Sequence, residues 1–355
     1  MIDPPASLCI VHAISSDRFA GVEQFVRRLA IRQAEDGHRV HVIGGAAAHM
    51  ESPLRAAGVE YEPARTLRAV FHAVRPTLAA SDVINTHMTD ADLAVVAARI
   101  SSRGDPAIVS TRHFAQRRGS IGPRLPYRFA ERRIDADISI SSAVAAAVEV
   151  PSTVVYPGVE PVTESDPSPR RRTILIAQRL QPEKHTALGL HAFAASGLAS
   201  LGWVLQIAGS GSDEPSLRTL ADQLEISHAV RFLGFRTDLA RLMTEAGILL
   251  ATSPFEHFGL TVLESMSAAL PVVAADAAGH AEMLGGLDER ALFAPDDVTA
   301  AARSLRALAD DDEGRTRLGS LERDRQSSTF TLRGQADGTL AVYRDVIAAR
   351  RRGLR

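Results

Sequence analysis

Two glutamates on either side of a short turn are the residues of this chain best suited to chemistry. Glu256 precedes, and Glu264 follows, the Phe-Gly-Leu run 258–260, which comes just after the apolar segment 248–251. The apolar segment predicts a buried strand, and the glycine permits a tight entry into a helix, with Glu264 one turn inside it. A helix tip offers free N–H groups and a positive dipole end. Either glutamate alone fits an ordinary solvated acid, but together they suit a ligand with hydroxyl groups around a diphosphate.

A pair of cations follows another predicted strand. Arg179 and Lys184 come after the apolar segment 173–177. Most arginines and lysines are simple surface charges. At the carboxyl end of a strand, however, two cations can neutralise the charge that develops on a departing diphosphate. These two residues are therefore candidates for catalysis, together with Glu256.

Glycines after two further predicted strands would let the backbone approach a ligand closely. Gly209 follows the segment 203–208, but the complete Gly-x-Gly-x-x-Gly pattern of dinucleotide-binding proteins is absent there. Gly21 follows the first predicted strand, 8–13, at the start of a predicted helix. A glycine at that place also serves as a simple helix cap, and the two interpretations of Gly21 are equally good.

Two histidines follow predicted strands of the N-terminal half. His113 comes after the strand 107–111, and His87 comes after the strand 82–86. A lone histidine is more often a structural residue than a catalytic one. The carboxyl ends of parallel strands are nevertheless where such sheets bind ligands. We therefore take His113, in preference to His87, as a candidate catalytic residue.

A regular alternation of strands and helices must position these residues. Short apolar runs alternate with segments of helical periodicity in both halves, and the stretch 157–172 between them is rich in proline and charge. The pattern predicts an α/β protein with two Rossmann-like, doubly wound parallel sheets, whose ligand-binding edges face each other across a cleft. We expect domains at residues 1–160 and 161–328, followed by a helix over 329–355.

Composition narrows the class of protein. The chain has 355 residues, 45% of them hydrophobic, which is enough for each half to bury a core of its own. A net charge of −2 gives no general attraction to nucleic acid. Cys9 is the only cysteine, so an internal disulfide and a cysteine-based metal cluster are excluded. Without a secretory signal or a long apolar span, the sequence favours a cytoplasmic protein.

These motifs together resemble glycosyltransferase family 4, a large retaining group with the GT-B fold. The family has two glutamates separated by seven residues around a Phe-Gly-Leu core, and Glu256 and Glu264 match them. It also has an arginine and a lysine at the spacing of Arg179 and Lys184. The family usually has glycine before that arginine, where this chain has Gln178.

The resemblance implies a function and a role for each matching residue. It implies transfer of a hexosyl unit from a nucleoside diphosphate sugar to a hydroxyl group of a glycan, lipid-linked or small-molecule acceptor, with retention of anomeric configuration. The N-terminal domain would then lie on the acceptor side, the C-terminal domain would bind the donor, and the helix 329–355 would pack back on the N-terminal domain. By this resemblance, Glu256 contacts sugar hydroxyls, Glu264 contacts the ribose, and Arg179 and Lys184 bind the diphosphate. His113 lies near the sugar. The donor approaches the backbone at Phe258, Gly259, Leu260, Gly209 and Gly21.

Two Asp-x-Asp sequences, at 90–92 and 135–137, resemble the metal-binding motif of a different transferase fold. Neither lies beside the donor motifs, and Asp90 stands at a predicted helix start, where aspartate is a good cap. We interpret both as structural and expect no essential metal and no cofactor other than the donor substrate. The alternatives are a non-catalytic sugar-nucleotide-binding protein and a GT-B nucleotide-sugar epimerase, whereas a dinucleotide oxidoreductase fits less well.

The segment 112–133 is strongly basic. It contains seven arginines against the single acid Glu131, and Leu125, Tyr127 and Phe129 lie among them. Such a segment is either a solvated basic face or a contact with an anionic membrane surface, and the two interpretations have even odds. The second would make the protein peripheral at the membrane.

Overall fold

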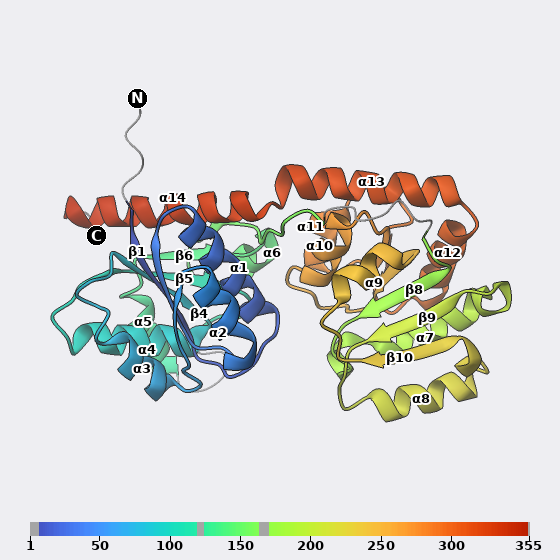
Figure 1. The fold of residues 1–355 in the computed structure, drawn as a ribbon, viewed down its shortest axis with the longest axis horizontal. Helices are drawn as coiled ribbons and strands as arrows, with labels where there is room; N and C mark the ends of the chain where they lie inside the picture. Colours follow the sequence, from blue (N-terminus) through green and yellow to red (C-terminus); the bar gives the residue numbers. More distant parts are fainter. Residues whose placement is uncertain (1–6, 119–123, 163–169, 354–355) are drawn as a thin grey trace. The chain divides into compact units, whose positions relative to one another are not determined.

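The computed structural model describes residues 7–118, 124–162 and 170–353. The chain forms two compact units, one comprising Met1–Pro157 with Leu332–Arg355 and the other comprising Gly158–Thr331. Each unit is built around one parallel β-sheet with helices on both faces (Figure 1), so the predicted α/β class is confirmed. Within the described ranges, none of the helices has both the length and the apolar character needed to cross a bilayer.

The sheet of the first unit runs in the order β3-β2-β1-β4-β5-β6-β7. Its strands are β1 (Cys9–Ile14), β2 (Arg39–Ile43), β3 (Glu60–Glu62), β4 (Val83–His87), β5 (Ala107–Arg112), β6 (Ala136–Ser139) and β7 (Thr153–Val154). The chain moves outward in one direction from β1 and then in the other from β4. Doubly wound sheets bind ligands at the carboxyl ends of strands beside such a reversal. His12 lies opposite Asn85 across the β1–β4 pair, and His87 lies opposite Thr111 across the β4–β5 pair.

Helices cover both faces of this sheet (Figure 1). They are α1 (Gly21–Glu35), α2 (Ala47–Ala56), α3 (Leu67–Val74), α4 (Thr89–Ile100), α5 (Arg124–Glu131), α6 (Ser142–Ala147) and α14 (Leu332–Arg351). The last of these belongs to the first unit although it comes from the end of the chain, and it packs against α1, β5 and β6. Its Tyr343 is fully buried and accepts a hydrogen bond of 2.7 Å from the Asn85 side chain.

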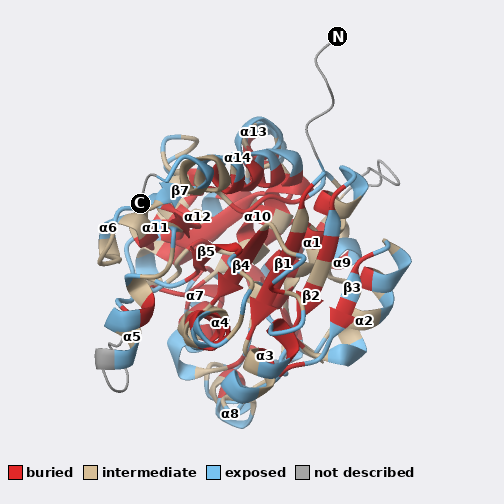
Figure 2. Cartoon of the chain, turned by 90° about the vertical axis from the view of Figure 1, so that its left-hand side faces the viewer, coloured by how far each residue is buried: buried red, intermediate tan, exposed pale blue. Residues whose placement is uncertain are grey.

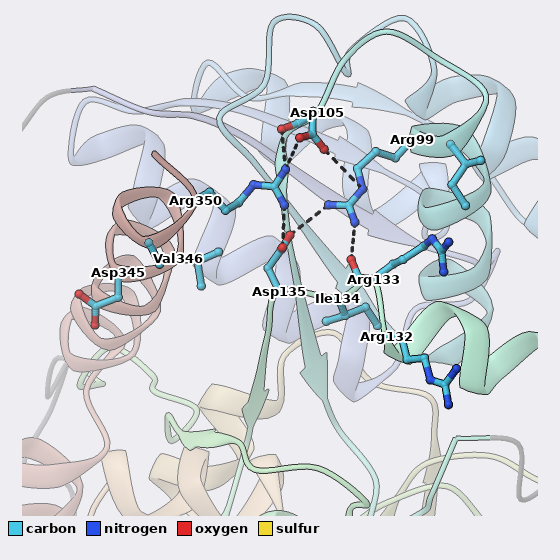
Figure 3. Close-up of a pocket in the computed structure, with 11 residues that line it drawn as sticks. Arg99, Asp105, Arg132, Arg133, Ile134, Asp135, Asp345, Val346 and Arg350 are labelled. Carbon is cyan, nitrogen blue, oxygen red and sulfur yellow. Dashed lines mark hydrogen bonds and ion pairs between the residues drawn. The ribbon is translucent and has the colours of Figure 1, made fainter. Parts of the chain in front are cut away.

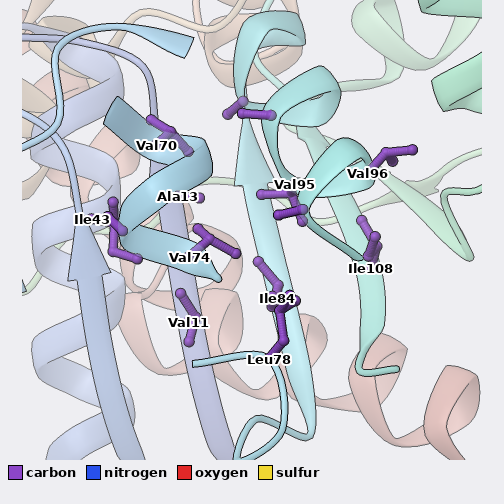
Figure 4. Packing of buried hydrophobic residues seen from close by; sticks show 14 of the residues in the cluster. Val11, Ala13, Ile43, Val70, Val74, Leu78, Ile84, Val95, Val96 and Ile108 are labelled. Carbon is purple, nitrogen blue, oxygen red and sulfur yellow. The ribbon is translucent and has the colours of Figure 1, made fainter. Parts of the chain in front are cut away.

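Aliphatic side chains fill the interface between this sheet and the helices α3 and α4. Val11, Ile84 and Ile108, from three neighbouring strands, pack with Val74 of α3 and Val95 of α4 (Figure 4). The strands β1, β4 and β5 are buried along almost their whole length (Figure 2). Burial of each such side chain contributes about 1.5–3 kcal/mol. This packing therefore fixes the spacing of the strands and of the residues that follow them.

A ring of ion pairs fastens the end of α14 to the amino ends of β5 and β6. Arg350 pairs with Asp105 at 2.5 Å and with Asp135 at 2.6 Å. Arg99 pairs with the same two aspartates at 3.9 and 3.0 Å, which closes the ring (Figure 3). The ring borders a cavity of about 650 Å³. This cavity lies at the sheet edge opposite the candidate residues, and the charges in the ring are paired with one another, so we assign it a structural role.

The sheet of the second unit runs in the order β10-β9-β8-β11-β12-β13. Its strands are β8 (Thr173–Ala177), β9 (Val204–Ala208), β10 (Val230–Gly234), β11 (Ile248–Ala251), β12 (Val272–Ala275) and β13 (Leu292–Phe293). Its helices are α7 (Thr186–Ala195), α8 (Glu214–Gln223), α9 (Leu239–Glu245), α10 (Leu260–Ser267), α11 (Ala278–Leu284), α12 (Val298–Ala309) and α13 (Asp312–Thr329), with short helices η1 (Pro182–Lys184), η2 (Leu198–Leu201) and η3 (Ser227–Ala229). The central neighbours β8 and β11 are the strands that precede the candidate cations and glutamates.

The periodicity of the sequence misses two strands, β3 and β13. They have 3 and 2 residues, and each lies at an edge of its sheet with one neighbour. A segment of this length carries too little alternation to be recognised, and its strand conformation is set by pairing with β2 or β12.

Candidate active site

The turn between β11 and α10 brings the two glutamates to the carboxyl end of the second sheet. Gly259 caps α10 with a φ of 104°, which residues with side chains rarely adopt. Glu256 lies in the loop before this cap, and Glu264 lies half-buried in the second turn of α10. Phe258 is buried, and Leu260 is the first residue of the helix. Strand, turn and helix follow one another in the predicted order.

The tip of a second helix, α11, abuts this turn. The Gly279 amide donates to the Glu256 carbonyl at 3.0 Å, and a Cβ at Gly279 would overlap the backbone of Phe258. On the other side of the turn, a Cβ at Gly259 would stand only 3.0 Å from the buried ring of His280. Two glycines therefore allow the ends of α10 and α11 to meet around the backbone that carries Glu256.

Lys184 and Glu256 form an ion pair of 2.7 Å between Nζ and Oε2. Lys184 ends η1 after β8 and Glu256 follows β11, and these two strands are neighbours in the sheet. Both side chains are largely buried, with 19% and 22% of their surface exposed. Burial alone would raise the pKa of Glu256, but the Lys184 ammonium, helped by His280 and His257, outweighs burial and lowers it. Glu256 is therefore a carboxylate at neutral pH.

Gln178, the residue that departs from the family pattern, holds the backbone of Lys184 in place. Its Nε2 lies 3.0 Å from the Lys184 carbonyl, 2.9 Å from the Thr186 hydroxyl and 3.0 Å from the Thr252 hydroxyl. The Thr252 hydroxyl also donates to the Lys184 carbonyl at 2.7 Å. A glycine could make none of the Gln178 contacts. The larger side chain thus ties the ends of β8 and β11 to the start of α7.

The glycine loop after β9 packs against the same segment. Gly209 has a φ of 148°, and a Cβ on it would overlap the carbonyl oxygen of Gln178. A Cβ on Gly211 would likewise overlap the carbonyl oxygen of Leu180. Close backbone packing between two loops explains both glycines. The same packing fixes the backbone from Gln178 to Leu180, which carries Arg179.

Arg179 lies apart from the Lys184–Glu256 pair. Its side chain is 60% exposed and forms an ion pair of 3.0 Å with Glu183, which is 52% exposed. Exposed pairs of this kind contribute little to stability and exchange readily with other partners. Among the described residues the structure therefore brings Lys184 and Glu256 together and leaves Arg179 at the surface of the adjoining loop.

In the first unit, Gly21 is the first residue of α1, and Ala20 is the N-cap. The Glu23 carboxylate accepts a hydrogen bond of 2.8 Å from the Ala20 amide and so closes a capping box from one side. Gly21 is consequently not the cap itself. Its place at the tip of a helix after β1 remains compatible with approach of a ligand.

His113 is joined to other buried side chains by hydrogen bonds that run along the sheet. His113 Nε2 lies 3.0 Å from His87 Nδ1, and His87 Nε2 lies 3.0 Å from His12 Nδ1. His12 Nε2 in turn lies 2.7 Å from the side-chain oxygen of Gln33, on α1. The ring of Phe25 meets His113 edge-on at 4.8 Å. His87, the weaker candidate, is thus the middle member of a chain that ends at His113.

Burial keeps these three histidines neutral. It lowers the pKa of His12 to about 4, against a smaller opposing effect of the Gln33 hydrogen bond, and that of His113 to about 3. Burial also lowers the pKa of His87, and its two histidine neighbours lower it further. A charged imidazole here would lose water without gaining a carboxylate partner. Each ring at neutral pH therefore carries one proton, which it donates to one neighbour only.

The second aspartate of each Asp-x-Asp sequence forms an ion pair with the same arginine. Arg118 Nε pairs with Asp92 at 2.8 Å and its Nη2 pairs with Asp137 at 2.5 Å, and the Arg118 side chain is fully buried. The first aspartates are also engaged: Asp90 accepts from Tyr127, and Asp135 lies in the ring with Arg350. Among the described residues, no three acidic, histidine or cysteine side chains are placed as metal ligands.

The basic segment is divided between the interior and the surface. Arg112 and Arg118 are buried and share Glu149 at 2.9 and 3.1 Å, so they do not belong to a solvated face. Among the described residues of the segment, the exposed arginines and phenylalanines are Phe114, Arg117, Arg128, Phe129 and Arg132. Residues 119–123 lie outside the described part of the chain, as does the side chain of Arg124.

Several residues of these networks escaped the sequence analysis, among them His12, Gln33 and Tyr343, and the contacts of Gln178 were not foreseen either. His12 offered a signal, because a histidine within an apolar strand must find a buried partner. Tyr343 offered none, since its partner Asn85 is 258 positions away.

Comparison with known families identifies the class of protein. A model described as "Glycosyltransferase Family 4" matches residues 19–162, and one described as "Glycosyl transferases group 1" matches residues 163–325. Together they span almost the whole chain. The chain therefore belongs to the group 1, family 4 glycosyltransferases and is an enzyme, so the interpretations as a non-catalytic binding protein and as an epimerase are set aside.

Individual relatives agree with this assignment. The lipopolysaccharide core biosynthesis mannosyltransferase LpsB of Rhizobium meliloti is 27% identical over 62% of this chain and 68% of its own length. The mannosyltransferase LpcC of Rhizobium leguminosarum is 26% identical over 83% of each chain. Among solved structures, HepE of Anabaena in complex with UDP superposes with a TM-score of 0.79 over 95% of this chain and 100% of its own, at 19% identity. That likeness shows the GT-B fold.

The contacts of Gln178 lead to a first prediction. Gln178→Leu removes the side-chain amide that contacts the Lys184 carbonyl and the hydroxyls of Thr186 and Thr252, and is expected to lower the free energy of unfolding by about 1–3 kcal/mol. The measurement is urea denaturation. Gln181→Leu is the matched control, because the Gln181 side chain accepts a hydrogen bond from the exposed Ser212 hydroxyl. Equal stability of both variants and the wild type would contradict the role of Gln178.

The buried histidines lead to a second prediction. Their folded-state pKa values lie below the ordinary value near 6.5, so the unfolded chain binds protons first as the pH falls. The free energy of unfolding is expected to decrease between pH 6.5 and pH 4, with a slope for each histidine that approaches about 1.4 kcal/mol per pH unit only between its unfolded and folded pKa values. Denaturation at several pH values should give a shallower slope for His12→Gln. The control His72→Gln removes an exposed histidine and should leave the slope unaltered.

Proposed function

We propose that this glycosyltransferase moves a hexosyl unit from a nucleoside diphosphate sugar to a hydroxyl group, with retention of configuration and without an essential metal. The ion pair of Lys184 with Glu256 is the observation that carries the proposal. It places a cation and a carboxylate together at the carboxyl end of β8 and β11, beside the cap of α10. A cation neutralises the charge of a diphosphate, and a carboxylate accepts hydrogen bonds from sugar hydroxyls.

In the proposed reaction, Lys184, Arg179 and the free amides at the start of α10 stabilise the negative charge of the departing diphosphate. Glu256, held as a carboxylate, accepts hydrogen bonds from sugar hydroxyls. Glu264, one turn into α10, accepts a hydrogen bond from a ribose hydroxyl. The bond from the anomeric carbon to the diphosphate oxygen breaks, and the acceptor oxygen forms the new bond on the same face of the ring while its proton passes to the departing diphosphate oxygen.

The relatives support the choice of donor. LpsB and LpcC are mannosyltransferases, which transfer a hexose, and HepE was solved with UDP and with UDP-glucose. We propose a nucleoside diphosphate hexose of this kind for the present chain. Cations of the chain itself supply the neutralising charge in this scheme, which is why we propose turnover without a divalent metal.

Substitutions at the pair test the proposal. Lys184→Ala and Glu256→Gln are each expected to lower kcat by about 10²–10³, by analogy with the loss of one oxyanion-hole donor. Arg179→Ala should also lower kcat in an assay that contains a metal chelator. Turnover is measured as release of nucleoside diphosphate in the presence of acceptor, and the anomeric configuration of the product is read by NMR.

The control for these variants is Arg172→Ala, because Arg172 is an exposed arginine at the amino end of β8, away from the pair. It should retain the wild-type rate. Wild-type rates for Lys184→Ala and Glu256→Gln would overturn the assigned site, and loss of activity on chelation would overturn metal independence.

We further propose that the acceptor side contacts an anionic membrane surface. Phe114 and Phe129 expose 42% and 48% of their surface near Arg117, Arg128 and Arg132 in the chain. Aromatic side chains can enter the headgroup region while arginines contact anionic lipids, at about 1 kcal/mol for each charge.

Vesicle sedimentation tests this contact. At low salt the protein should bind vesicles containing anionic lipid more tightly than neutral vesicles, and Arg128→Ser with Arg132→Ser should weaken that binding by roughly tenfold or more, at about 1 kcal/mol for each charge. Arg65→Ser with Arg68→Ser, in exposed positions before and within α3, is the control. Equal binding to both kinds of vesicle would remove the proposal.

A further inference from the structure

The buried imidazole of His280 lies between the ends of two helices, close to the Lys184–Glu256 pair. His280 is 2% exposed and belongs to the first turn of α11. Its Nδ1 lies 2.9 Å from the carbonyl oxygen of Ala275, the last residue of β12. A carbonyl oxygen only accepts hydrogen bonds, so Nδ1 carries a proton and donates it. The neutral ring therefore has its free electron pair on Nε2.

Nε2 belongs to the side of the ring that faces the cap of α10. A Cβ built on Gly259 would stand 3.0 Å from Cδ2 and 3.1 Å from Nε2 of His280. Such distances leave no layer of solvent between the ring and the cap. The preceding residue, Gly279, meets the backbone of Phe258, and its amide donates to the Glu256 carbonyl at 3.0 Å. One short segment of α11 thus contacts the turn from Glu256 to Gly259.

Charged groups act on His280 from three segments of the second unit. Glu256 lies in the loop before α10, Lys184 at the end of η1, and Asp276 directly after β12. The loop before α10 also carries His257, whose pKa is lowered by burial and whose charged neighbours are Glu256 and Lys184. Two carboxylates that favour a second proton on His280 are thus opposed by one ammonium group.

Burial decides the charge of this ring. It lowers the pKa of His280, Lys184 lowers that pKa further, and the opposing effects of the two carboxylates and the Ala275 carbonyl do not restore it. The folded-state pKa is therefore below the ordinary value near 6.5, and the ring is neutral at neutral pH. At lower pH the second proton goes to Nε2, the nitrogen beside Gly259. It adds a buried positive charge next to the start of α10, where free amides already carry partial positive charge.

We propose that His280 is a positioning residue for the candidate active site and that a proton on its Nε2 inactivates that site. The neutral ring packs against Gly259 and holds the start of α10 and the Glu256 backbone in place. The charged ring is repelled by the helix end and competes with Lys184 for the Glu256 carboxylate, so both the turn and the ion pair are disturbed. This inference rests on the proposed sugar-transfer function and involves only residues of the second unit.

The pH dependence of turnover tests this role. In the wild-type enzyme, kcat is expected to fall by up to about tenfold per pH unit below the folded-state pKa of His280, because one proton inactivates the site. His280→Asn does not titrate and keeps an N–H donor at the place of Nδ1, so it should lose this acid limb. His280→Ala lacks that donor as well, and its kcat at neutral pH should be about tenfold below that of His280→Asn.

His191→Asn is the matched control, because His191 is an exposed histidine on α7 of the same unit. It should keep the wild-type acid limb. Buried histidines of the first unit also respond to acid, so rates are compared only at pH values where circular dichroism shows every variant folded. If His280→Asn does not fold, His280→Gln, which also does not titrate, replaces it. A wild-type profile without an acid limb, or an acid limb that persists in the asparagine variant, would overturn the proposal.

Nitrogen NMR tests the structural part of the proposal without any substrate. In the full-length protein labelled with 15N, we expect His280 to be the Nδ1–H tautomer at neutral pH. The amide signals of Gly259 and Gly279 should shift as His280 gains its second proton, and in His280→Asn they should no longer follow that titration. An Nε2–H tautomer, or glycine amides indifferent to the charge of His280, would contradict the inference.

The two measurements separate the causes of failure. If the protein transfers no sugar from any nucleoside diphosphate donor, the proposed function fails. Titration of the Gly259 and Gly279 amides together with His280 would still establish that this ring positions the start of α10.

Discussion

The largely buried ion pair of Lys184 with Glu256 is the interaction on which the candidate active site of the second unit depends. Two charges removed from water are tolerated only when they are close and further supported by hydrogen bonds. Gln178 and Thr252 supply that support by holding the Lys184 carbonyl. Glycines at 209, 259 and 279 allow the surrounding loops and helix ends to pack more closely than side chains would permit. These close backbone contacts hold the loops and helix ends around the pair.

In the first unit, buried polar side chains are held in place by hydrogen bonds to one another. Its sheet is covered on both faces, yet its strands carry His12, Asn85 and His87 in the interior. Burial without partners would be unfavourable for each of them, so they are linked to one another and to α1 and α14. Arg118 plays a comparable part for the buried aspartates of α4 and β6. Polar groups inside this unit thus connect distant segments with the carboxyl edge of its sheet.

Much of the fold and part of the site could be predicted from local patterns. The apolar runs predicted β8 and β11, and the Phe-Gly-Leu turn predicted the start of α10, because strand and helix periods are local properties. The spacing of Lys184 and Glu256 from those strands placed them at one edge. Their contact, the exposed position of Arg179 and the burial of Arg118 could not be predicted, since each depends on side chains that meet only when neighbouring strands pair.

By itself, the sequence determined the class of fold, the family and the set of residues at the carboxyl ends of the strands. These follow from patterns over a few consecutive residues and from motifs that can be recognised without knowledge of side-chain packing. Only the tertiary structure decided which of those residues touch. It gave Gln178 its role, joined three histidines into one line and paired the second aspartate of each Asp-x-Asp sequence with a buried arginine. The physical reason is that hydrogen bonds and ion pairs act over about 3 Å in space, between residues that can be hundreds of positions apart in the chain.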